Sequence, residues 1–442
     1  MGRASIFPFT IRQATGPATE KAELDTHESQ ILIAGSGPAG LVAALGFAQA
    51  GFAVALVGPP VPAGDRRTTA LMNPALAMLD RLGVLESLRD EAAPLKVMRI
   101  VDATNRLIRS PTVTFHASEI DEEQFGLNLP NAALTPALAE AVAAHPGIDW
   151  RKTVVSDWHL DAERAMATLA DGSAVSALLA VAADGRLSPA REAAGIRTSV
   201  RNYPQAALVL NFGHRSDHAF TSTEFHTETG PFTQVPLPGG HRSSLVWVAR
   251  PETADELTAL DEGELSVRVE DRMQSMLGRV TVEPGRQVYP LAAASPHRFA
   301  ANRVALVGEA AHVFPPIGAQ GLNLGIRDVG DLIDIASRNR SDPGAAPALA
   351  AYDVRRRPDI LARSGAVNLL NMSLLSDFLP VQMARSAGLT LLGSFSPLRG
   401  FFMREGLKPG SGFAALAGGL RKQIRRQDAV ADHEEQAGHG HH

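Results

Sequence analysis

The sequence predicts a mixed α/β protein, in which a Rossmann-like domain carries an inserted antiparallel-sheet α+β domain and is followed by a helical C-terminal region. Continuously apolar stretches at residues 31–34, 53–57, 178–182 and 303–307 are typical of strands buried on both faces of a parallel sheet. Between residues 203 and 289, strand-like runs alternate with turns such as Pro238-Gly239-Gly240, which indicates an antiparallel sheet. Residues 346–427 have a helical pattern, with breaks expected at Pro380, Pro397 and Pro409.

The composition is that of a globular protein with a large core. The chain has 442 residues, of which 45% are hydrophobic and 20% charged, and its net charge of −5 gives no indication of nucleic-acid binding. Because it lacks cysteine, any redox chemistry must come from a cofactor. No apolar run is long enough to predict a transmembrane helix, and no spacing of His, Asp and Glu predicts a metal site.

The first apolar stretch runs directly into a glycine-rich turn. Residues 31–34 are followed by Gly35, Gly37 and Gly40 in the pattern GxGxxG, and then by a helix expected over residues 38–50. Gly35 would form the tight turn, Gly37 would let the backbone approach a pyrophosphate, and Gly40 would let the helix pack on the strand. The helix begins with Pro38 and Ala39, and its N-terminus would direct N–H groups at the phosphates. The segment predicts a dinucleotide site.

The following elements are predicted in chain order. After the strand at residues 53–57, the run 67–71 leads into a helical stretch that ends near Gly83, and residues 97–105 and 107–115 are strands that could form a hairpin. A helix is expected over residues 134–144. The strand at residues 178–182 leads into Asp184-Gly185, a common turn by itself. A helix over residues 257–277 is expected to cover the antiparallel sheet.

A second glycine-rich segment repeats the logic of the first. The strand at residues 303–307 ends at Gly308, Glu309 follows, and a loop at residues 318–323 opens a helix that reaches Asn339. Glu309 can accept hydrogen bonds from sugar hydroxyls, and the loop can direct backbone N–H groups at a developing anion. Arg67 could contact a phosphate or be a solvated surface residue, and no catalytic role is assigned to His312. The apolar face of the helix carries Leu322, Ile326, Val329 and Ile333.

Taken together, these segments resemble the group A flavoprotein monooxygenases, which share the p-hydroxybenzoate hydroxylase fold, and among them the ubiquinone-biosynthesis hydroxylases. The similarity runs from Gln30 to about Leu407, and its most specific part is the run Gly321-Leu322-Asn323-Leu324-Gly325-Ile326-Arg327-Asp328. It implies that the bound dinucleotide is FAD. The FAD-binding residues that it implies are Gly35, Gly37, Pro38, Ala39, Gly40, Arg67, Asn131, Asp184, Gly185, Gly308, Glu309, Pro316, Gly318, Gln320, Gly321, Leu322 and Asn323.

The resemblance also implies an activity. NAD(P)H would reduce the FAD, O2 would give a flavin C4a-hydroperoxide, and its terminal oxygen would be transferred to the ring of a polyprenylated phenol. The flavin would carry the chemistry, so no side chain is predicted to be catalytic. The alternatives are a group A hydroxylase of a soluble aromatic or natural product and a flavin-bound, non-catalytic scaffold of a biosynthetic assembly. Other ubiquinone-biosynthesis proteins are expected partners.

The expected domain limits follow from these patterns. Residues 30–190 and 295–345 would form the FAD-binding domain, residues 191–294 the substrate domain, residues 72–125 part of the substrate site, and residues 346–427 the helical region, with a disordered arm at 1–29 and tail at 428–442. The apolar residues 413–420 precede four basic residues between 421 and 426, which predicts either peripheral membrane contact or a solvated helix end. The expected location is the cytoplasm, at the inner membrane face, or alternatively the mitochondrial matrix.

Two positions depart from the family pattern. The second strand ends in Gly58-Pro59-Pro60, where the family usually has an acid that holds the adenosine ribose, and this predicts weaker FAD binding. Glu309 stands where the family usually has Asp or sometimes Asn, and its additional methylene is expected to shift the loop slightly.

Overall fold

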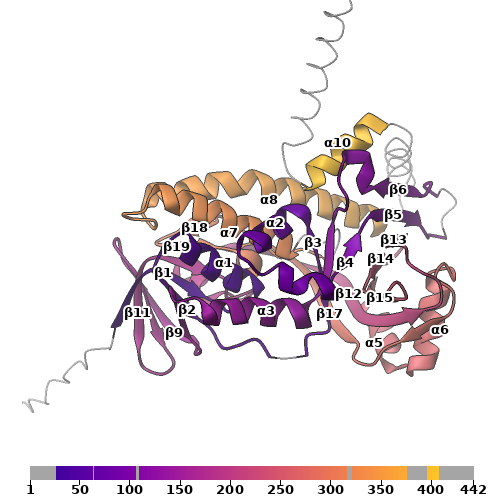
Figure 1. Ribbon diagram of the computed structural model, residues 1–442, viewed down its shortest axis with the longest axis horizontal. Coiled ribbons are helices and arrows are strands. Elements are labelled where there is room, and N and C mark those ends of the chain that lie inside the picture. The colour runs from indigo at the N-terminus through magenta and orange to yellow at the C-terminus, as the bar shows by residue number, and fades with distance from the viewer. Residues whose placement is uncertain (1–25, 63, 106–108, 316–320, 376–395, 408–442) are drawn as a thin grey trace, which may run out of the picture.

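A mixed sheet of mainly parallel strands forms one half of the computed structural model, which describes residues 26–62, 64–105, 109–315, 321–375 and 396–407 (Figure 1). Its strand order is β18-β19-β11-β1-β2-β8, in which β19, β11, β1, β2 and β8 are parallel. An antiparallel hairpin of β9 and β10 extends from β11. The strands are β1 (Thr26–Ala34), β2 (Val54–Val57), β8 (Ile148–Arg151), β9 (Val155–Leu160), β10 (Ala165–Leu169), β11 (Ala174–Ala182), β18 (Ala300–Ala301) and β19 (Val304–Leu306).

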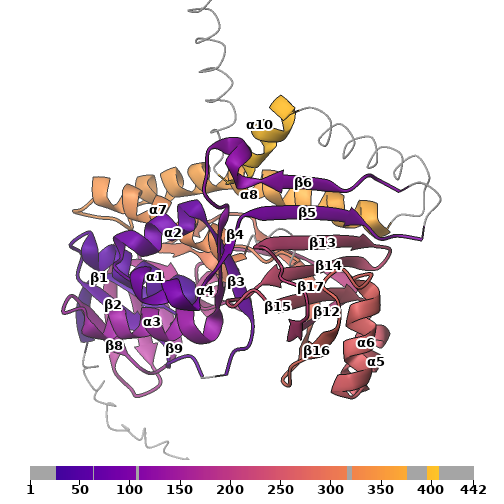
Figure 2. The ribbon, with the colours of Figure 1, turned by 45° about the vertical axis from the view of Figure 1, so that its right-hand side comes forward.

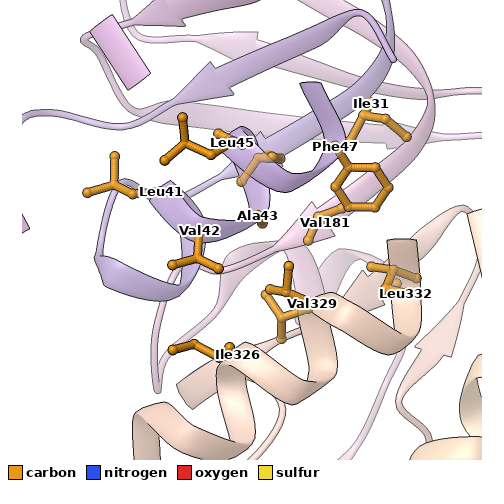
Figure 3. Packing of buried hydrophobic residues seen from close by; sticks show 14 of the residues in the cluster. Ile31, Leu41, Val42, Ala43, Leu45, Phe47, Val181, Ile326, Val329 and Leu332 are labelled. Carbon is orange, nitrogen blue, oxygen red and sulfur yellow. The ribbon is translucent and has the colours of Figure 1, made fainter. Parts of the chain in front are cut away.

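Helices pack on this sheet, and together they bury the largest hydrophobic core among the described residues. Helix α1 (Pro38–Gln49) packs on the sheet beside α7 (Gly321–Arg338), and Figure 3 shows Val42 of α1 facing Val329 of α7. Helix α3 (Asn131–Ala144) also packs on α1, and the short helix α4 (Pro189–Ala193) follows β11. The expected apolar face of α7 is confirmed, since Ile326 and Val329 are buried and Leu322 and Ile333 pack against the same core.

The second half is a large, mostly antiparallel sheet with helices on one face (Figure 2). Its order is β16-β12-β15-β14-β13-β5-β6, and β17 also pairs with β12. Helices α5 (Pro251–Ala259) and α6 (Glu262–Arg272) bury alternate side chains of the sheet, including Phe225, Phe232 and Trp247. The strands are β5 (Val97–Asp102), β6 (Val113–His116), β12 (Thr198–His214), β13 (Thr221–Thr227), β14 (Gly230–Pro236), β15 (Arg242–Ala249), β16 (Val280–Val282) and β17 (Gln287–Pro296).

Smaller elements connect the two halves. Strands β3 (Thr68–Met72), β7 (Gly126–Pro130) and β4 (Ala93–Leu95) form a three-stranded sheet, and α2 (Asn73–Arg81) follows β3. The long helix α8 (Ala346–Leu375) contacts β18 and β19 as well as β14, so it spans both halves. Helix α10 (Ser396–Leu407) lies against η2 (Ala117–Ile120); the other short 3-10 helices are η1 (Glu86–Glu91) and η3 (Gly308–Ala310).

The expected Rossmann-like sheet and the antiparallel sheet are both confirmed, but several element limits differ from the expectation. Strand β1 begins at Thr26, and the helix expected over residues 257–277 is two helices. Asp261 separates them because its carboxylate caps α6 by accepting the N–H of Glu264 at 2.8 Å. Pro358 lies inside α8, and Pro397 belongs to the first turn of α10 rather than to a break, while Pro380 and Pro409 lie outside the described residues. None of the described helices is long and apolar enough to span a membrane.

Candidate functional site

Three loops meet at one edge of the parallel sheet. Strands β1, β11 and β19 are neighbours, with Ala34 opposite Ala182 and Ala182 opposite Leu306. Because the strands are parallel, the loops that follow them leave the sheet at the same edge, which is where open α/β sheets bind ligands. The structure thus brings together the three segments that begin at Gly35, Ala183 and Gly308.

The three glycines of the first loop differ in what surrounds them. Gly35 has a φ of +108°, and a Cβ there would lie 2.2 Å from the carbonyl oxygen of Ala183. A Cβ on Gly40 would lie 1.9 Å from the carbonyl oxygen of Gly35. Gly37 differs, because a Cβ there would meet no atom of the described residues within 4 Å. The chain itself therefore requires Gly35 and Gly40, whereas the open space beside Gly37, at the N-terminus of α1, is suited to a ligand.

Asp184 presents a buried oxygen to the same edge. Its Oδ2 accepts the N–H of Ala190 at 3.1 Å, while Oδ1 is buried with no hydrogen-bond partner among the described residues. Burial raises the pKa of the Asp184 carboxyl above its ordinary value, although the hydrogen bonds from Ser188 and Ala190 act in the opposite direction. A buried, unpaired carboxylate oxygen is costly, and a ligand hydroxyl would satisfy it.

A buried network of hydrogen bonds and ion pairs around Asp328 of α7 holds the third loop. Gly308 has a φ of +61°, and its N–H donates to Oδ2 of Asp328 in α7 at 3.0 Å. Nε2 of His312 and Nε of Arg356 each lie 2.7 Å from the Asp328 carboxylate, and all three side chains are at most 1% exposed. His312 also stacks on Phe314. His312 and Asp328 therefore fix the loop position through packing and hydrogen bonds.

The Glu309 side chain does not join this network and instead contacts the second loop. Nε of Arg186 lies 3.2 Å from Oε2 of Glu309, and both side chains are about half exposed. Arg186, which directly follows Asp184-Gly185, was not among the predicted site residues. Gly185 has a φ of +85°, and a Cβ there would meet none of the described atoms within 4 Å. The ion pair connects the second and third loops at their solvent side.

Arg67 and Asn131 come together through a residue that sequence reasoning missed. The Asp65 carboxylate accepts hydrogen bonds from Nη2 of Arg67 at 2.7 Å and from Nδ2 of Asn131 at 2.9 Å. Burial raises the pKa of Asp65, but these hydrogen bonds outweigh it and lower the pKa below its ordinary value. The Arg67 guanidinium also lies 5.4 Å from the centre of the Tyr289 ring in β17. Arg67 thus lies between the parallel-sheet half and the large sheet.

The start of α7 is tied to β3. The side chain of Asn323 accepts the N–H of Met72 at 2.8 Å and donates to the carbonyl of Ala70 at 2.7 Å. Gly321 is the first residue of the helix, and Leu322 packs against the core. The predicted residues Pro316, Gly318 and Gln320 lie outside the described residues.

Gly58 packs closely against the first loop. A Cβ on Gly58 would lie 2.6 Å from Oγ and 2.7 Å from N of Ser36, and the Ser36 hydroxyl donates to the carbonyl of Pro59. An acidic side chain at position 58 would therefore collide with Ser36 of the first loop. Weaker FAD binding stays a prediction, and adding an acid at position 58 would disturb the first loop as well as supply a ribose contact.

These observations fit a bound dinucleotide. The space beside Gly37 adjoins the positive end of α1, and the free oxygen of Asp184 lies at the same edge of the sheet. Among the described residues, no group of three or more His, Cys, Asp or Glu side chains could hold a metal ion.

Comparisons with known proteins agree with this geometry. The model of the FAD binding domain family matches residues 28–362. Ubiquinone hydroxylase UbiL of Rhodospirillum rubrum is 33% identical over 404 residues, which cover 89% of this chain and 92% of that protein. The 3-demethoxyubiquinol 3-hydroxylase of Escherichia coli is 29% identical over 374 residues, or 82% of this chain and 94% of that protein. The crystal structure of p-nitrophenol 4-monooxygenase PnpA from Pseudomonas putida has the same fold, with a TM-score of 0.69 at 21% identity over 87% of this chain and 97% of that one. The chain belongs to the FAD binding domain family and is an FAD-dependent monooxygenase.

Proposed function

We propose that this protein hydroxylates the aromatic ring of a polyprenylated phenol in ubiquinone biosynthesis, with NAD(P)H and O2 as co-substrates. The names of the relatives from Rhodospirillum rubrum and Escherichia coli support this substrate class. The observation that carries the proposal is that the three loops leave neighbouring strands at one edge of the sheet, with Gly37 at the N-terminus of α1 and Asp184 in the loop after β11. A soluble aromatic substrate is the second candidate, favoured by the fold shared with a p-nitrophenol monooxygenase.

We assign the FAD contacts as follows. The pyrophosphate would lie on the N-terminus of α1, where the N–H groups and dipole of the helix stabilise negative charge. Asp184 would accept a hydrogen bond from an FAD hydroxyl, and Arg67 would place a positive charge near the cofactor. The chemistry supplied by bound FAD is reduction by NAD(P)H followed by transfer of oxygen from O2. The full set of proposed contacts is Gly35, Gly37, Pro38, Ala39, Gly40, Arg67, Asn131, Asp184, Gly185, Gly308, Glu309, Pro316, Gly318, Gln320, Gly321, Leu322 and Asn323.

The division of labour that we propose follows the two sheets. Residues 30–190 and 295–345 would hold FAD, while residues 191–294, with help from residues 72–125, would hold the ring to be hydroxylated. Such an arrangement places the substrate between the flavin and the large sheet, where water can be excluded while the ring is oriented.

The test is turnover by the purified, FAD-loaded protein. We expect a polyprenylated phenol to stimulate NAD(P)H oxidation and to gain one oxygen atom, which mass spectrometry would trace to O2 labelled with ¹⁸O. A free phenol hydroxylated faster than its prenylated form would favour the soluble-substrate candidate. If the FAD-loaded protein fails to oxidise NAD(P)H whichever of the two phenols is added, a non-catalytic scaffold would be the better explanation.

We further propose contact with the membrane face that holds such substrates. This membrane contact depends on residues 413–426, which lie outside the described residues. Its support is their composition, an apolar stretch followed by basic residues. Flotation with anionic liposomes should capture the full chain more strongly than a chain that ends at Pro409. Equal capture of both would remove residues 413–426 from the proposal. A bacterial cytoplasmic location at the inner membrane face and a mitochondrial matrix location both agree with this contact.

A further inference from the structure

The two faces of the large sheet differ in how completely they are covered. Side chains that point toward α5 and α6, such as Phe225, Phe232 and Trp247, are at most 7% exposed. Their neighbours along the strands point to the opposite face, and there Glu224, Thr233 and Val246 are only partly buried. The opposite face is less completely covered: Met403 of α10 packs near Met98 at its β5 end, but the side chains around Glu224 stay partly exposed, so a ligand can reach them.

That opposite face is turned toward the elements of the cofactor half. Oγ1 of Thr68 in β3 lies 2.9 Å from Oγ of Ser244 in β15. The Tyr289 ring contacts Arg67, one of the predicted FAD residues. In the strand register, Ser244 and Tyr289 point to the same side as Val246. Glu224 is opposite Thr233, which is opposite Val246, so Glu224 also points to this side.

Glu224 and His226 form a hydrogen-bonded pair on this face. They are two residues apart in β13 and so share a side of the sheet. Nε2 of His226 lies 2.9 Å from Oε1 of Glu224, with the His226 side chain 2% exposed and the Glu224 side chain 17% exposed. A carboxylate only accepts hydrogen bonds, so Nε2 carries the proton and donates. The buried imidazole thereby fixes the orientation of a carboxylate that remains partly accessible.

Glu224 also retains an available acceptor. Among the described residues, none donates to its Oε2. The other carboxylate on this face, Asp102, is already engaged by the N–H and hydroxyl of Thr104 and by the N–H of Ser110, at 2.7–3.1 Å. In the register Glu224 has Ile100 on one side and Thr233 on the other, with Val246 beyond, so the surface beside the acceptor is part apolar and part polar.

We propose that Glu224 accepts the hydrogen bond of the phenolic hydroxyl of the substrate, with His226 as the positioning residue. This inference rests on the proposed function and names the group that recognises its substrate. A hydrogen bond from a phenol to a carboxylate is charge-assisted and therefore strong. It also leaves more electron density on the ring oxygen, and thus on the ring that is to accept an oxygen atom. Ile100 and Val246, on the same side of the sheet, offer apolar contacts to an aromatic ring.

The test compares a polyprenylated phenol with its methyl ether as ligands of the FAD-loaded protein, followed by the change in flavin absorbance. Wild type should bind the phenol at least about tenfold more tightly, as expected for one hydrogen bond to a charged acceptor. Glu224→Gln should lose this preference while its affinity for the ether stays the same. The control, Glu252→Gln in the exposed first turn of α5, makes the same charge change on the far side of the sheet and should keep the preference.

His226 is tested by conservative rescue. His226→Gln, which can still donate to Glu224, should keep more of the phenol preference than His226→Leu, which cannot. A purely structural role would instead lower the affinity for phenol and ether equally. FAD content and thermal unfolding of each variant show whether it is folded.

The outcomes separate this inference from the proposed function. If wild type binds the two ligands equally, the assignment of Glu224 is wrong, whatever the variants do. If wild type prefers the phenol and Glu224→Gln keeps that preference, the assignment alone is wrong. If wild type binds neither ligand, both the proposed function and the assignment are overturned.

Discussion

Replacing Gly37 by valine separates the stability of the fold from its affinity for FAD. In the part of the chain that the structure describes, no atom lies within 4 Å of a Cβ at this position, and the backbone φ of −68° with ψ of 173° is one that valine adopts readily. The stability cost should be limited to that of a poor helix N-cap, about 1 kcal/mol or less. The side chain would instead fill the space that we assign to the pyrophosphate.

The expected loss of FAD affinity is large by comparison. A phosphate displaced from the N-terminus of α1 would lose at least one hydrogen bond to a charged group, worth roughly 1.5–3 kcal/mol. The Kd for FAD should therefore rise roughly tenfold to a hundredfold. Titration of the apoprotein with FAD, followed by flavin fluorescence, measures the Kd, and thermal unfolding of the apoprotein measures stability.

Two further glycines provide the controls. A Cβ on Gly330 in α7 also meets no atom within 4 Å among the residues that the structure describes, so Gly330→Val should leave the Kd for FAD unchanged. Gly40→Ala should behave in the opposite way and destabilise the apoprotein itself, because its Cβ would lie 1.9 Å from a carbonyl oxygen. A Gly37→Val protein with the wild-type Kd would show that the pyrophosphate does not approach Gly37, and the placement of FAD would be refuted.

Three other predictions follow from the same loops. Burial raises the folded-state pKa of Asp184 above its ordinary value of 3.8, so wild-type apoprotein should lose stability as the pH rises from 3.8 through that raised pKa. Asp184→Asn apoprotein should not show this loss of stability, and thermal unfolding should find it more stable than wild type at neutral pH. The variant should nevertheless bind FAD more weakly. A pH dependence of stability equal to that of wild type would contradict the prediction. Gly58→Ala should lower the free energy of unfolding by about 1–3 kcal/mol, since its Cβ would lie 2.6 Å from Oγ of Ser36, and urea denaturation measures this. Asp328→Ala should cost about 3–5 kcal/mol in the same assay, because it leaves the buried guanidinium of Arg356 without one of its partners; a loss below about 1 kcal/mol would show that the network does not anchor the loop.

The sequence by itself determined the features that depend on residues close together in the chain. The strand, turn and helix around Gly35 and Gly40 follow from apolar runs and turn chemistry, and the buried face of α7 follows from its helical period. The order of the three motifs was enough to predict the family, the cofactor and the class of activity. The same local signals were weak where a polar cap decides the structure, as at Asp261, which divides the expected helix into α5 and α6.

The tertiary structure alone decided which distant residues meet. Ser36 lies against Gly58, Arg186 pairs with Glu309, and Asp328 holds Gly308, although no period or motif connects these positions. The pair of Glu224 and His226 is visible in the sequence as two polar residues two apart. Only the strand register shows that it points away from α5 and α6, to the side on which Ser244 and Tyr289 contact Thr68 and Arg67. The physical reason is that turn and helix preferences act over a few residues, whereas the packing of whole sheets and helices places the side chains of a site.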